Sequence, residues 1–584
     1  MPYYRFILAS VLAFCFSAFC YRSSAQSPFL DSVLTEYATI SGGTGFAVAV
    51  VKKDSLLYAN AFGFRDLGNR LPVTVNTVFP IGSCTKAFTA ALTGALKEKI
   101  SLDKPVRTYI PELKFYNTEM TEQITVRDLL SHRTGLPRHD YSWFFLATEN
   151  RDSMLKRVAF LEPVARIAEK WEYNNFGYFL AGLVCERVMN LSYEQGINRY
   201  ILKPLQMQRT YFEFDRLRTD TNVAIGYRNS NGEARALAYH PLIAMSPAGG
   251  LNSNVLDMSR WLSAWISRKN ILPADFYSQA ITSQIVTKAA LPEKQSGTYF
   301  STYGLGWFLS SYRGHYRVEH GGNIDGFTST ASFFPADSIG IVVLSNRNAS
   351  VLPALVRNLL SDHFLDLIPS DRSEEMERLR MKKRNTSVDT TRFSMTAPMA
   401  HRMSSYTGSY QHPGYGSFKI ISRNDSLFAR FGNFTWWLAP QQYNSFRGIE
   451  MMANGRPDLN DTRLLVQFQS NVNGVIEKIS IPFEPAVPPI VFVKEFFALQ
   501  VNPRIYTGRY WIDEEEGTIS VNEAGSLSLN LAGQKSIELI PREDDIFNLK
   551  GYKEYDLIFS RDKKKQVIGF TLHQSDANFK ATKL

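Results

Sequence analysis

An abrupt change in sequence pattern near residue 400 divides the chain into two parts of different architecture. Before it, strand-like and helix-like segments alternate; after it come only short strands with alternating apolar residues. The motif "YTGSY" at residue 406 returns as "YTGRY" at residue 506, and each copy leads into a similar order of strands and turns. Two copies are too few for a solenoid, so we expect two small all-β domains, each a sandwich or a barrel.

Before the change, strands stand at both ends of the sequence and helices lie between them. Alternating apolar residues predict strand pairs at residues 45–66 and 327–346. Apolar residues at helical spacing predict helices at residues 83–99, 174–188 and 351–367. Because the strand pairs lie far apart in the sequence, we expect one α/β unit whose sheet is completed by distant segments.

A chain of 584 residues is too long for one hydrophobic core, so several domains are expected. Residues 368–400 are charged and polar with little apolar periodicity, which is typical of a linker. We therefore expect a signal peptide over residues 1–25, a mixed domain over 27–367, and β-domains over 401–488 and 500–584.

The first 25 residues carry the pattern of an export signal. Arg5 precedes an apolar run shorter than the roughly 20 residues needed to span a bilayer, and small residues favour cleavage after Ala25. Cys20 raises the alternative of a lipoprotein, but the bulky Phe19 stands where a lipobox has a small residue. We expect an exported protein, periplasmic or secreted, without an integral membrane span.

The composition argues against several classes of function. Apart from one short lysine run, the net charge of +10 is spread along the chain, which argues against a nucleic-acid partner. Cys84 and Cys185 remain after the signal, lie in helical segments, and are expected to be buried thiols rather than a disulfide. The nine histidines show no paired helical spacing, so we expect neither a metal nor another cofactor.

A serine at the start of an apolar helix is the first candidate for chemistry. In "FPIGSCTKAFTAALTG", Ser83 follows Gly82, and Lys86 lies one helical turn later on the same face. A partly desolvated lysine can accept the serine proton, and the first turn directs N–H groups at a developing oxyanion. Ser-x-x-Lys occurs four times, but the other copies lie in charged, surface-like segments. A helix N-cap is the alternative for Ser83, and Cys84 is expected to face the core.

A second segment, "WEYNNFGYF", places Tyr173 and Asn175 just ahead of a helical run. A phenol and an amide at such a boundary can lie near a nucleophile, or contact Lys86 or a substrate. The alternative is an asparagine that caps the helix, with an aromatic residue packed beside it.

A third segment, "VEHGGNIDGF", places His320, Gly321 and Gly322 at the opening of an expected edge strand. The two glycines leave room for a substrate to lie alongside. The backbone N–H of Asn323 can then complete an oxyanion hole with the N–H of Ser83. The alternative is a simple turn.

The order of these motifs resembles the serine β-lactamase and penicillin-binding-protein superfamily, in particular its class C β-lactamase, esterase and D-amino-acid peptidase branch. "TVRDLLSHRTGLP" at 125–137 and "SPAGGLNSNVLDMSRWL" at 246–262 resemble further segments of that branch. The likeness spans residues 30–367. It implies a helical subdomain packed on an antiparallel sheet with flanking helices.

The resemblance also implies a role for each motif residue. Ser83 would be the acylated nucleophile, Lys86 its activating partner, and Tyr173 the proton relay. Asn175 and His320, with the glycines that follow the histidine, would line the substrate site.

One departure from the superfamily affects the expected substrate. β-Lactamases and carboxypeptidases usually carry Lys-Thr-Gly where this chain has His-Gly-Gly, and a neutral imidazole is a weaker anchor for a substrate carboxylate. We therefore expect an exported serine hydrolase that acts on an ester or amide, such as a D-amino-acid peptide or a peptidoglycan fragment. The alternatives are a D-alanyl-D-alanine carboxypeptidase or weak β-lactamase, and a catalytically degenerate penicillin-binding-like protein.

The first β-domain resembles a poorly characterised domain appended to such hydrolases in Bacteroidetes-type bacteria. Covering of the active site and contact with the cell envelope are two hypotheses for its role. The pair Trp436 and Trp437 belongs either to its core or to a binding patch.

Overall fold

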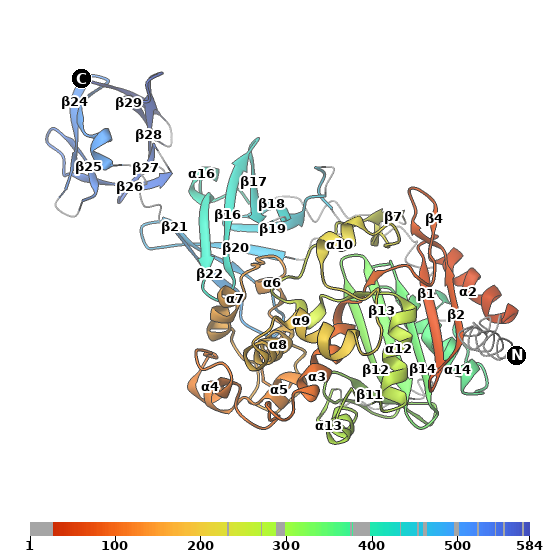
Figure 1. Ribbon diagram of the computed structural model, residues 1–584. Coiled ribbons are helices and arrows are strands. Elements are labelled where there is room, and N and C mark those ends of the chain that lie inside the picture. Colours follow the sequence, from red (N-terminus) through yellow and green to blue (C-terminus); the bar gives the residue numbers. More distant parts are fainter. Residues whose placement is uncertain are drawn as a thin grey trace, which may run out of the picture. The chain divides into compact units, whose positions relative to one another are not determined.

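The structure is a computed structural model that describes most of the chain (Figure 1). The expected signal peptide, Cys20 and the central part of the expected linker lie outside the described residues. The described residues are 27–230, 233–269, 271–287, 298–373, 376–377, 397–432, 434–452, 455–458, 464–495, 502–522, 525–543, 545–552, 555–574 and 577–584.

The described residues form two compact units. The first takes its residues from Met1–Arg138 and Ala165–Thr386, and the second from His139–Val164 and Ser387–Leu584. Residues 139–164, which lie inside the expected domain 27–367, therefore pack with the β-domains.

An eight-stranded antiparallel sheet lies at the centre of the first unit, in the order β2-β1-β14-β13-β12-β11-β10-β9 (Figure 1). Phe46 of β1 pairs with Ser345 of β14, so the first and the last hairpins of this unit join within one sheet. The expectation that distant segments complete the sheet is confirmed. The strands are β1 (Phe46–Lys52), β2 (Ser55–Phe62), β9 (Ile285–Val286), β10 (Ser301–Tyr303), β11 (Phe308–Tyr312), β12 (His315–Ile324), β13 (Phe327–Phe334) and β14 (Ile339–Ser345).

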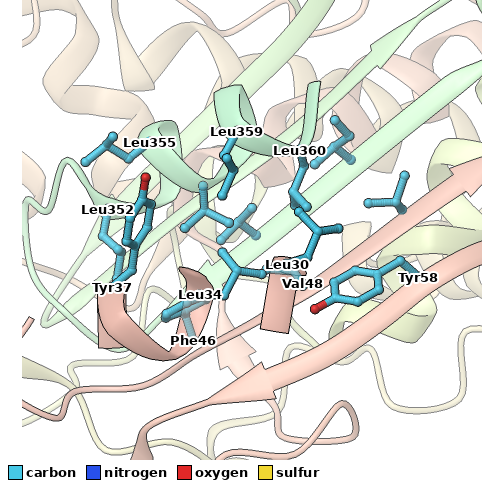
Figure 2. Close-up of a cluster of buried hydrophobic side chains, with 14 of the residues drawn as sticks. Leu30, Leu34, Tyr37, Phe46, Val48, Tyr58, Leu352, Leu355, Leu359 and Leu360 are labelled. Atoms are coloured by element: carbon cyan, nitrogen blue, oxygen red, sulfur yellow. The ribbon is translucent and has the colours of Figure 1, made fainter. Parts of the chain in front are cut away.

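Helices cover both faces of this sheet. α2 (Pro28–Ile40) and α14 (Leu352–Phe364) pack on one face, and α12 (Val255–Ile266) packs on the other. Figure 2 shows the cluster on the first face, where Leu34 of α2 and Leu360 of α14 meet Val48 of β1. Full burial of each such side chain contributes about 1.5–3 kcal/mol to folding.

A helical subdomain packs beside the sheet and contains the first two candidate motifs, whereas His320–Gly322 lie on β12 of the sheet. The central helices of the subdomain are α3 (Thr85–Ala95), α5 (Val126–Leu130), α8 (Asn175–Met189), α9 (Tyr193–Ile197) and α11 (Ser246–Gly249), which contact one another. The mixed fold class predicted for this part of the chain is confirmed. No helix among the described residues combines the length and the apolar character needed to cross a bilayer.

Shorter elements complete the first unit. They are three two-stranded sheets, a few short helices and several single turns: β3 (Phe64–Asp66) with β4 (Leu71–Pro72), β5 (Phe79–Pro80) with β8 (Asn252–Ser253), β6 (Tyr227–Ser230) with β7 (Glu233–Ala236), α4 (Thr118–Gln123), α10 (Phe214–Thr219), α13 (Ala274–Ala280), and the turns η1 (Gly82–Cys84), η2 (Val106–Thr108) and η4 (Asn198–Leu202).

The second unit contains two closed antiparallel barrels, which confirms two all-β domains and selects the barrel over the sandwich. The first barrel is β15 (Gly408–His412), β16 (Gly416–Arg423), β17 (Ser426–Phe431), β18 (Phe434–Gln442), β19 (Ser445–Glu450), β20 (Leu464–Ser470), β21 (Ile476–Ile481) and β22 (Ile490–Lys494). The second is β23 (Gly508–Ile512), β24 (Glu515–Val521), β25 (Leu527–Leu531), β26 (Ile537–Glu543), β27 (Ile546–Leu549), β28 (Asp556–Arg561), β29 (Val567–His573) and β30 (Asn578–Lys583).

The repeated motif has the same structure in both barrels. The Tyr410 hydroxyl donates to Tyr406 O at 2.8 Å, and the Tyr510 hydroxyl donates to Tyr506 O at 2.7 Å. The glycine between the tyrosines has φ +136° in the first barrel and +144° in the second, values that residues with a Cβ atom rarely adopt. The conformation of this turn explains why the motif recurs.

Packed side chains fill the first barrel. Trp436 is 5% exposed, and its ring lies 4.4 Å from that of Phe431 and 6.4 Å from that of Phe483. Trp436 therefore belongs to the core, and of the two tryptophans only Trp437 is partly exposed. Filled interiors are typical of small barrels whose walls carry large side chains.

The segment His139–Val164 is attached to the first barrel by polar and aromatic contacts. The Tyr415 hydroxyl donates to His139 Nδ1 at 2.7 Å, and Ser142 Oγ donates to the Gly414 carbonyl at 2.6 Å. The ring of Tyr141 stacks on that of Phe483 with centroids 4.4 Å apart. The segment contains α6 (Asp140–Trp143), α7 (Arg151–Arg157) and the turn η3 (Val158–Phe160); the barrels add α16 (Met403–Tyr406) and η6 (Pro503–Tyr506).

Candidate active site

Ser83 lies in a tight turn that leads from β5 into α3. Gly82 has φ +50°, and a Cβ on it would lie 3.1 Å from the backbone nitrogen of Asn323. Ser83 is half-buried in the turn η1, and the N-cap of α3 is Cys84, whose side chain makes no capping hydrogen bond. Ser83 is therefore not the N-cap of α3, which was the alternative role considered for it.

Lys86 meets Ser83 as the helical spacing predicts. Its side chain is fully buried, and its Nζ lies 3.2 Å from Ser83 Oγ. Nζ also lies 2.7 Å from Asn175 Oδ1 and 2.8 Å from the Ala248 carbonyl oxygen. All three of these oxygens are uncharged. The amine is thus held beside Ser83 by groups from two other helices, Asn175 of α8 and Ala248 of α11.

Tyr173 completes this cluster from the loop before α8. Its ring centroid is 4.8 Å from Lys86 Nζ, 4.3 Å from the ring centroid of His132 and 6.4 Å from that of His320. The side chain is partly exposed. The Tyr173 ring therefore packs against the buried amine and is partly open to solvent.

The start of α8 fixes Tyr173 and Asn175. Asn174 caps the helix, because its Oδ1 accepts from the Gly177 N–H at 2.9 Å, and its own N–H donates to His132 Nδ1 at 3.1 Å. The asparagine cap that the sequence offers as an alternative thus exists one residue earlier. Asn175, at the first helical position, is left to contact Lys86.

The expectation that His320–Gly322 opens an edge strand is wrong. β12 lies between β11 and β13, and the segment falls in its second half. β11 is shorter and pairs only as far as Glu319, so beyond that point β12 has β13 on one side and the turn η1 on the other. A Cβ on Gly322 would lie 2.0 Å from the Ile81 carbonyl oxygen, so the glycine allows this close approach. The Asn323 side chain accepts hydrogen bonds from the Thr328 hydroxyl and the Ala349 N–H. The backbone nitrogen of Asn323 lies beside Gly82 of the serine turn.

His320 is buried and uncharged. Its Nδ1–H donates to the Gly321 carbonyl at 2.7 Å, so its Nε2 accepts from the Tyr303 hydroxyl at 3.0 Å. Burial and the nearby Lys86 lower the pKa of His320 to about 3. A ring with both nitrogens occupied is not a free base; it orients the strand beside Ser83.

Two further residues near the motifs take structural roles. Arg317 is buried and lies 3.0 Å from Glu319, so it is committed to an ion pair. The Cys84 thiol donates to the His320 carbonyl at 3.2 Å, and burial raises its pKa to about 12. The prediction that Cys84 faces the core is confirmed, and Cys185 is also a buried free thiol.

Three contributors to the site were not identified from the sequence. Ala248 acts through its backbone carbonyl, which no side-chain pattern reveals. Tyr303 lies on β10, outside the motifs, and its hydrogen bond to His320 and its ring contact with His132 place it here. His132 belongs to one of the motifs quoted above, but its contact with Tyr173 is visible only in the folded structure. Among the described residues, no group of three or more metal-binding side chains occurs.

Comparison with known proteins gives the family. The model of the Beta-lactamase family matches residues 30–366, which is more than half of the chain. The chain belongs to the beta-lactamase family and is a serine hydrolase. The model of a domain of unknown function, DUF3471, matches residues 394–494, which include the first barrel.

Two named relatives are each about one quarter identical to this chain over the aligned residues. Unguisins hydrolase ungD of Aspergillus violaceofuscus is 27% identical over 421 residues, covering 65% of this chain and 73% of that protein. Protein flp of Staphylococcus aureus is 27% identical over 320 residues, covering 54% of this chain and 62% of that protein. The chain thus matches less than two thirds of the length of flp.

A solved structure supports the fold. The octameric penicillin-binding protein homologue from Pyrococcus abyssi superposes with a TM-score of 0.54 and 23% identity, covering 80% of this chain and 99% of that one. At this identity the likeness shows the fold alone. The specific roles of the motif residues stay predictions.

Proposed function

We propose that this serine hydrolase acts on esters or amides through an acyl-enzyme formed on Ser83. The observation that carries the proposal is the 3.2 Å contact between Lys86 Nζ and Ser83 Oγ, in a place where Asn175 and Ala248 hold the amine. A nucleophile and a base within hydrogen-bond distance, with the base oriented by further groups, form the arrangement that nucleophilic catalysis requires.

In this proposal Lys86, as the neutral amine, accepts the Ser83 proton while Oγ forms a bond with the substrate carbonyl carbon. The proton then passes through Tyr173 to the leaving alcohol or amine, whose bond to the carbonyl carbon breaks. Water then attacks the acyl-enzyme with Tyr173 as its base, and the proton passes through Tyr173 to the neutral Lys86 amine. Lys86 returns a proton to Ser83 Oγ as the bond between Oγ and the acyl carbon breaks, and the acid is released. Burial of Lys86 supports this proposal, because burial favours the neutral form of a lysine.

The negative charge that develops on the substrate oxygen needs hydrogen-bond donors. The backbone N–H groups of Ser83 and Asn323 are the proposed pair, since the turn at Gly82 brings the two segments together. Each donor of this kind contributes roughly 3–4 kcal/mol to transition-state stabilisation in other enzymes.

We propose D-amino-acid peptides or peptidoglycan fragments as substrates. The neutral His320 argues against strong binding of a β-lactam carboxylate at the third motif, and therefore against an efficient β-lactamase. A weak β-lactamase or a D-alanyl-D-alanine carboxypeptidase is the nearest alternative. The likeness to a protein named unguisins hydrolase supports hydrolysis.

A covalent probe tests the proposal. A fluorophosphonate should label the wild-type chain on one peptide, which contains Ser83, and intact-mass spectra should show an adduct during turnover of a substrate panel. Ser83→Ala should abolish both signals. Ser101→Ala is the matched control, since it alters another Ser-x-x-Lys motif and should leave labelling unchanged.

The same experiment distinguishes the proposed enzyme from a catalytically degenerate binding protein. Labelling that depends on Ser83 contradicts the idea of a degenerate scaffold. No labelling of a folded wild-type chain, or labelling that survives Ser83→Ala, contradicts the acyl-enzyme.

We also propose that the chain is exported by its first 25 residues. The apolar run after Arg5 and the small residues that end at Ala25 support this. N-terminal sequencing of the mature protein should start at residue 26; a lipid-modified Cys20 would support a lipoprotein, and an intact Met1 would contradict export.

A further inference from the structure

His132 accepts hydrogen bonds from both residues that flank Tyr173. Its backbone carbonyl accepts from the Glu172 N–H at 2.9 Å, and its Nδ1 accepts from the Asn174 N–H at 3.1 Å. Tyr173 lies between these two donors in the sequence, and its ring centroid is 4.3 Å from that of His132. One residue thus fixes the backbone on both sides of the proposed proton relay and also packs against its ring.

The backbone of His132 is strained in the conformation that makes these bonds. The residue directly follows Ser131, the C-cap of α5, and has φ +58°. A left-handed backbone costs a residue with a Cβ roughly 1–2 kcal/mol. Strain of this kind persists only where the surrounding structure imposes it, and it is concentrated at functional sites. Here the strained turn presents the carbonyl and the ring of one residue to the same loop.

The hydrogen bonds of His132 determine its tautomer. Because Nδ1 accepts, the ring proton is on Nε2. Nε2 is buried and has no hydrogen-bond partner among the residues that the structure describes, and the rings of Tyr178 and Tyr303 lie beside the imidazole. Burial and then the nearby Lys86 lower the pKa of His132 well below its ordinary value. A neutral ring whose basic nitrogen already binds a backbone N–H is an acceptor, not a base.

His320, the second imidazole near Tyr173, is engaged elsewhere. Its ring nitrogens bond the Gly321 carbonyl and the Tyr303 hydroxyl, and its centroid is 6.4 Å from that of Tyr173. Of the two imidazoles, His132 is therefore the one whose hydrogen bonds hold the loop that carries Tyr173.

We infer that His132 is a positioning residue that sets Tyr173 for proton transfer to the leaving group. The inference rests on the proposed function, in which Tyr173 passes the proton to the leaving alcohol or amine. Proton transfer needs heavy atoms within hydrogen-bond reach, and a displacement of about 1 Å can cost about 100-fold in rate. Loss of the two bonds should therefore slow the reactions in which the leaving group must be protonated, and spare those in which it departs as an anion.

The test compares two esters with the same acyl group, an ethyl ester and a p-nitrophenyl ester. In both, Ser83 Oγ bonds to the carbonyl carbon and the bond to the leaving oxygen breaks. Nitrophenolate departs as the anion, so it needs no proton from Tyr173, whereas ethoxide must take one. Both esters give the same acyl-enzyme, so a difference in kcat/KM comes from acylation. The acid released from each is measured by chromatography.

His132→Gln and His132→Asn form the matched pair of variants. Glutamine carries its amide one carbon beyond the position of Nδ1, whereas asparagine places Oδ1 near that position and tolerates the left-handed backbone. His132→Gln should lower kcat/KM roughly 10- to 100-fold for the ethyl ester, and much less for the nitrophenyl ester. His132→Asn should restore most of the loss.

His363→Gln, which alters an exposed histidine of α14, is the control and should leave both values near wild type. Melting temperatures establish that each variant is folded. Equal losses for the two esters, no loss in His132→Gln, or no recovery in His132→Asn overturns the inference.

The tautomer of His132 is a readout in the active wild-type chain. In NMR spectra of the protein labelled with ¹⁵N-histidine, the signals of His132 are those absent from His132→Asn. Nδ1 should be unprotonated and Nε2 protonated between about pH 5 and 8. A proton on Nδ1 overturns the inference, because Nδ1 could not then accept from the Asn174 N–H.

A fluorophosphonate separates this inference from the proposed function. Ser83 Oγ bonds to phosphorus and fluoride departs as the anion, so labelling does not require Tyr173 to protonate the leaving group. Labelling of His132→Gln at close to the wild-type rate supports the inference. A loss of labelling as large as the loss of ethyl-ester hydrolysis would show that His132 supports the whole site, and overturns it. Absence of labelling in the wild type overturns the proposed function, and this inference with it.

Discussion

At the scale of single residues, the site depends on which neighbour holds which atom. Asn174 caps α8 and thereby frees Asn175 to contact Lys86, although the two asparagines are adjacent and chemically identical. Helical geometry brings Lys86 to Ser83, because residues three apart share a face. The cluster is therefore assembled from local geometry and from the contacts that Asn175 of α8 and Ala248 of α11 make with Lys86.

The first prediction concerns Cys84. Because burial raises its pKa to about 12, the thiol should remain protonated and inaccessible in the folded chain. Iodoacetamide should leave Cys84 unmodified under native conditions and alkylate it after unfolding, as measured by peptide mapping. Native alkylation at the rate of an exposed thiol would show that Cys84 does not face the core.

The second prediction concerns His320 and pH. Its pKa of about 3 in the folded chain lies below the ordinary value of about 6.5, so the unfolded chain binds the proton first as pH falls. The free energy of unfolding should therefore decrease as pH falls from about 6.5 toward 3, by up to ~1.4 kcal/mol per pH unit.

For activity, the same shift means that His320 does not titrate between about pH 5 and 8. The acylation rate of His320→Gln, measured across this range, should be lower than that of the wild type by a constant factor. Loss of an acid limb with a midpoint near pH 6 in the variant would show that the imidazole does titrate in the folded enzyme.

At the scale of elements, the contact between β12 and the serine turn sets the oxyanion geometry. A Cβ on Gly322 would meet the Ile81 carbonyl oxygen at 2.0 Å, whereas a Cβ on Gly321 would meet its nearest neighbour, Ser329 O, at 3.6 Å. The two glycines are adjacent, yet only one of them is needed for close approach.

The third prediction follows from this pair. Gly322→Ala should separate β12 from the turn, cost about 1–3 kcal/mol of stability and strongly reduce acylation of Ser83. Gly321→Ala should do neither, apart from a small effect on the strand. The measurements are the melting temperature and the rate of fluorophosphonate labelling; equal behaviour of the two variants would contradict the packing of β12 on the turn.

Much of the fold followed from local patterns, and the exceptions involve strand order. The hairpins and the helix starting near Ser83 were predicted because periodicity and turn residues are local signals. The edge position of His320 was wrong, because strand order depends on pairing between distant segments. The carbonyl of Ala248 and the ring of Tyr303 were missed for the same reason, since their contacts with Lys86 and His320 are not local.

At the scale of the whole molecule, residues 139–164 pack with barrel residues that lie far later in the sequence. Tyr141 stacks on Phe483, and His139 accepts a hydrogen bond from Tyr415. No sequence pattern signalled this, because the aromatic run at 143–145 reads equally well as core of the first unit. The first barrel thus packs its aromatic side chains against residues 139–164, which lie within the region 30–366 matched by the beta-lactamase family model.

The fourth prediction tests that partnership in the full chain. Phe483→Ala removes the ring beneath Tyr141 and should accelerate amide hydrogen exchange in residues 139–164. Phe559→Ala is the matched control, because it truncates a similarly buried ring in the second barrel and should leave that exchange unchanged. Equal acceleration by both variants, or none by Phe483→Ala, would contradict the attachment of the segment to the first barrel.

The central claim is that the Lys86 amine takes the proton of Ser83, and the rate of acylation in Lys86→Ala tests it most directly. Time-resolved intact-mass spectra should show an acyl adduct on Ser83 in the wild type within the first turnover. In a folded Lys86→Ala chain the adduct should form roughly 10²–10⁴-fold more slowly. Adduct formation at the wild-type rate would contradict the account.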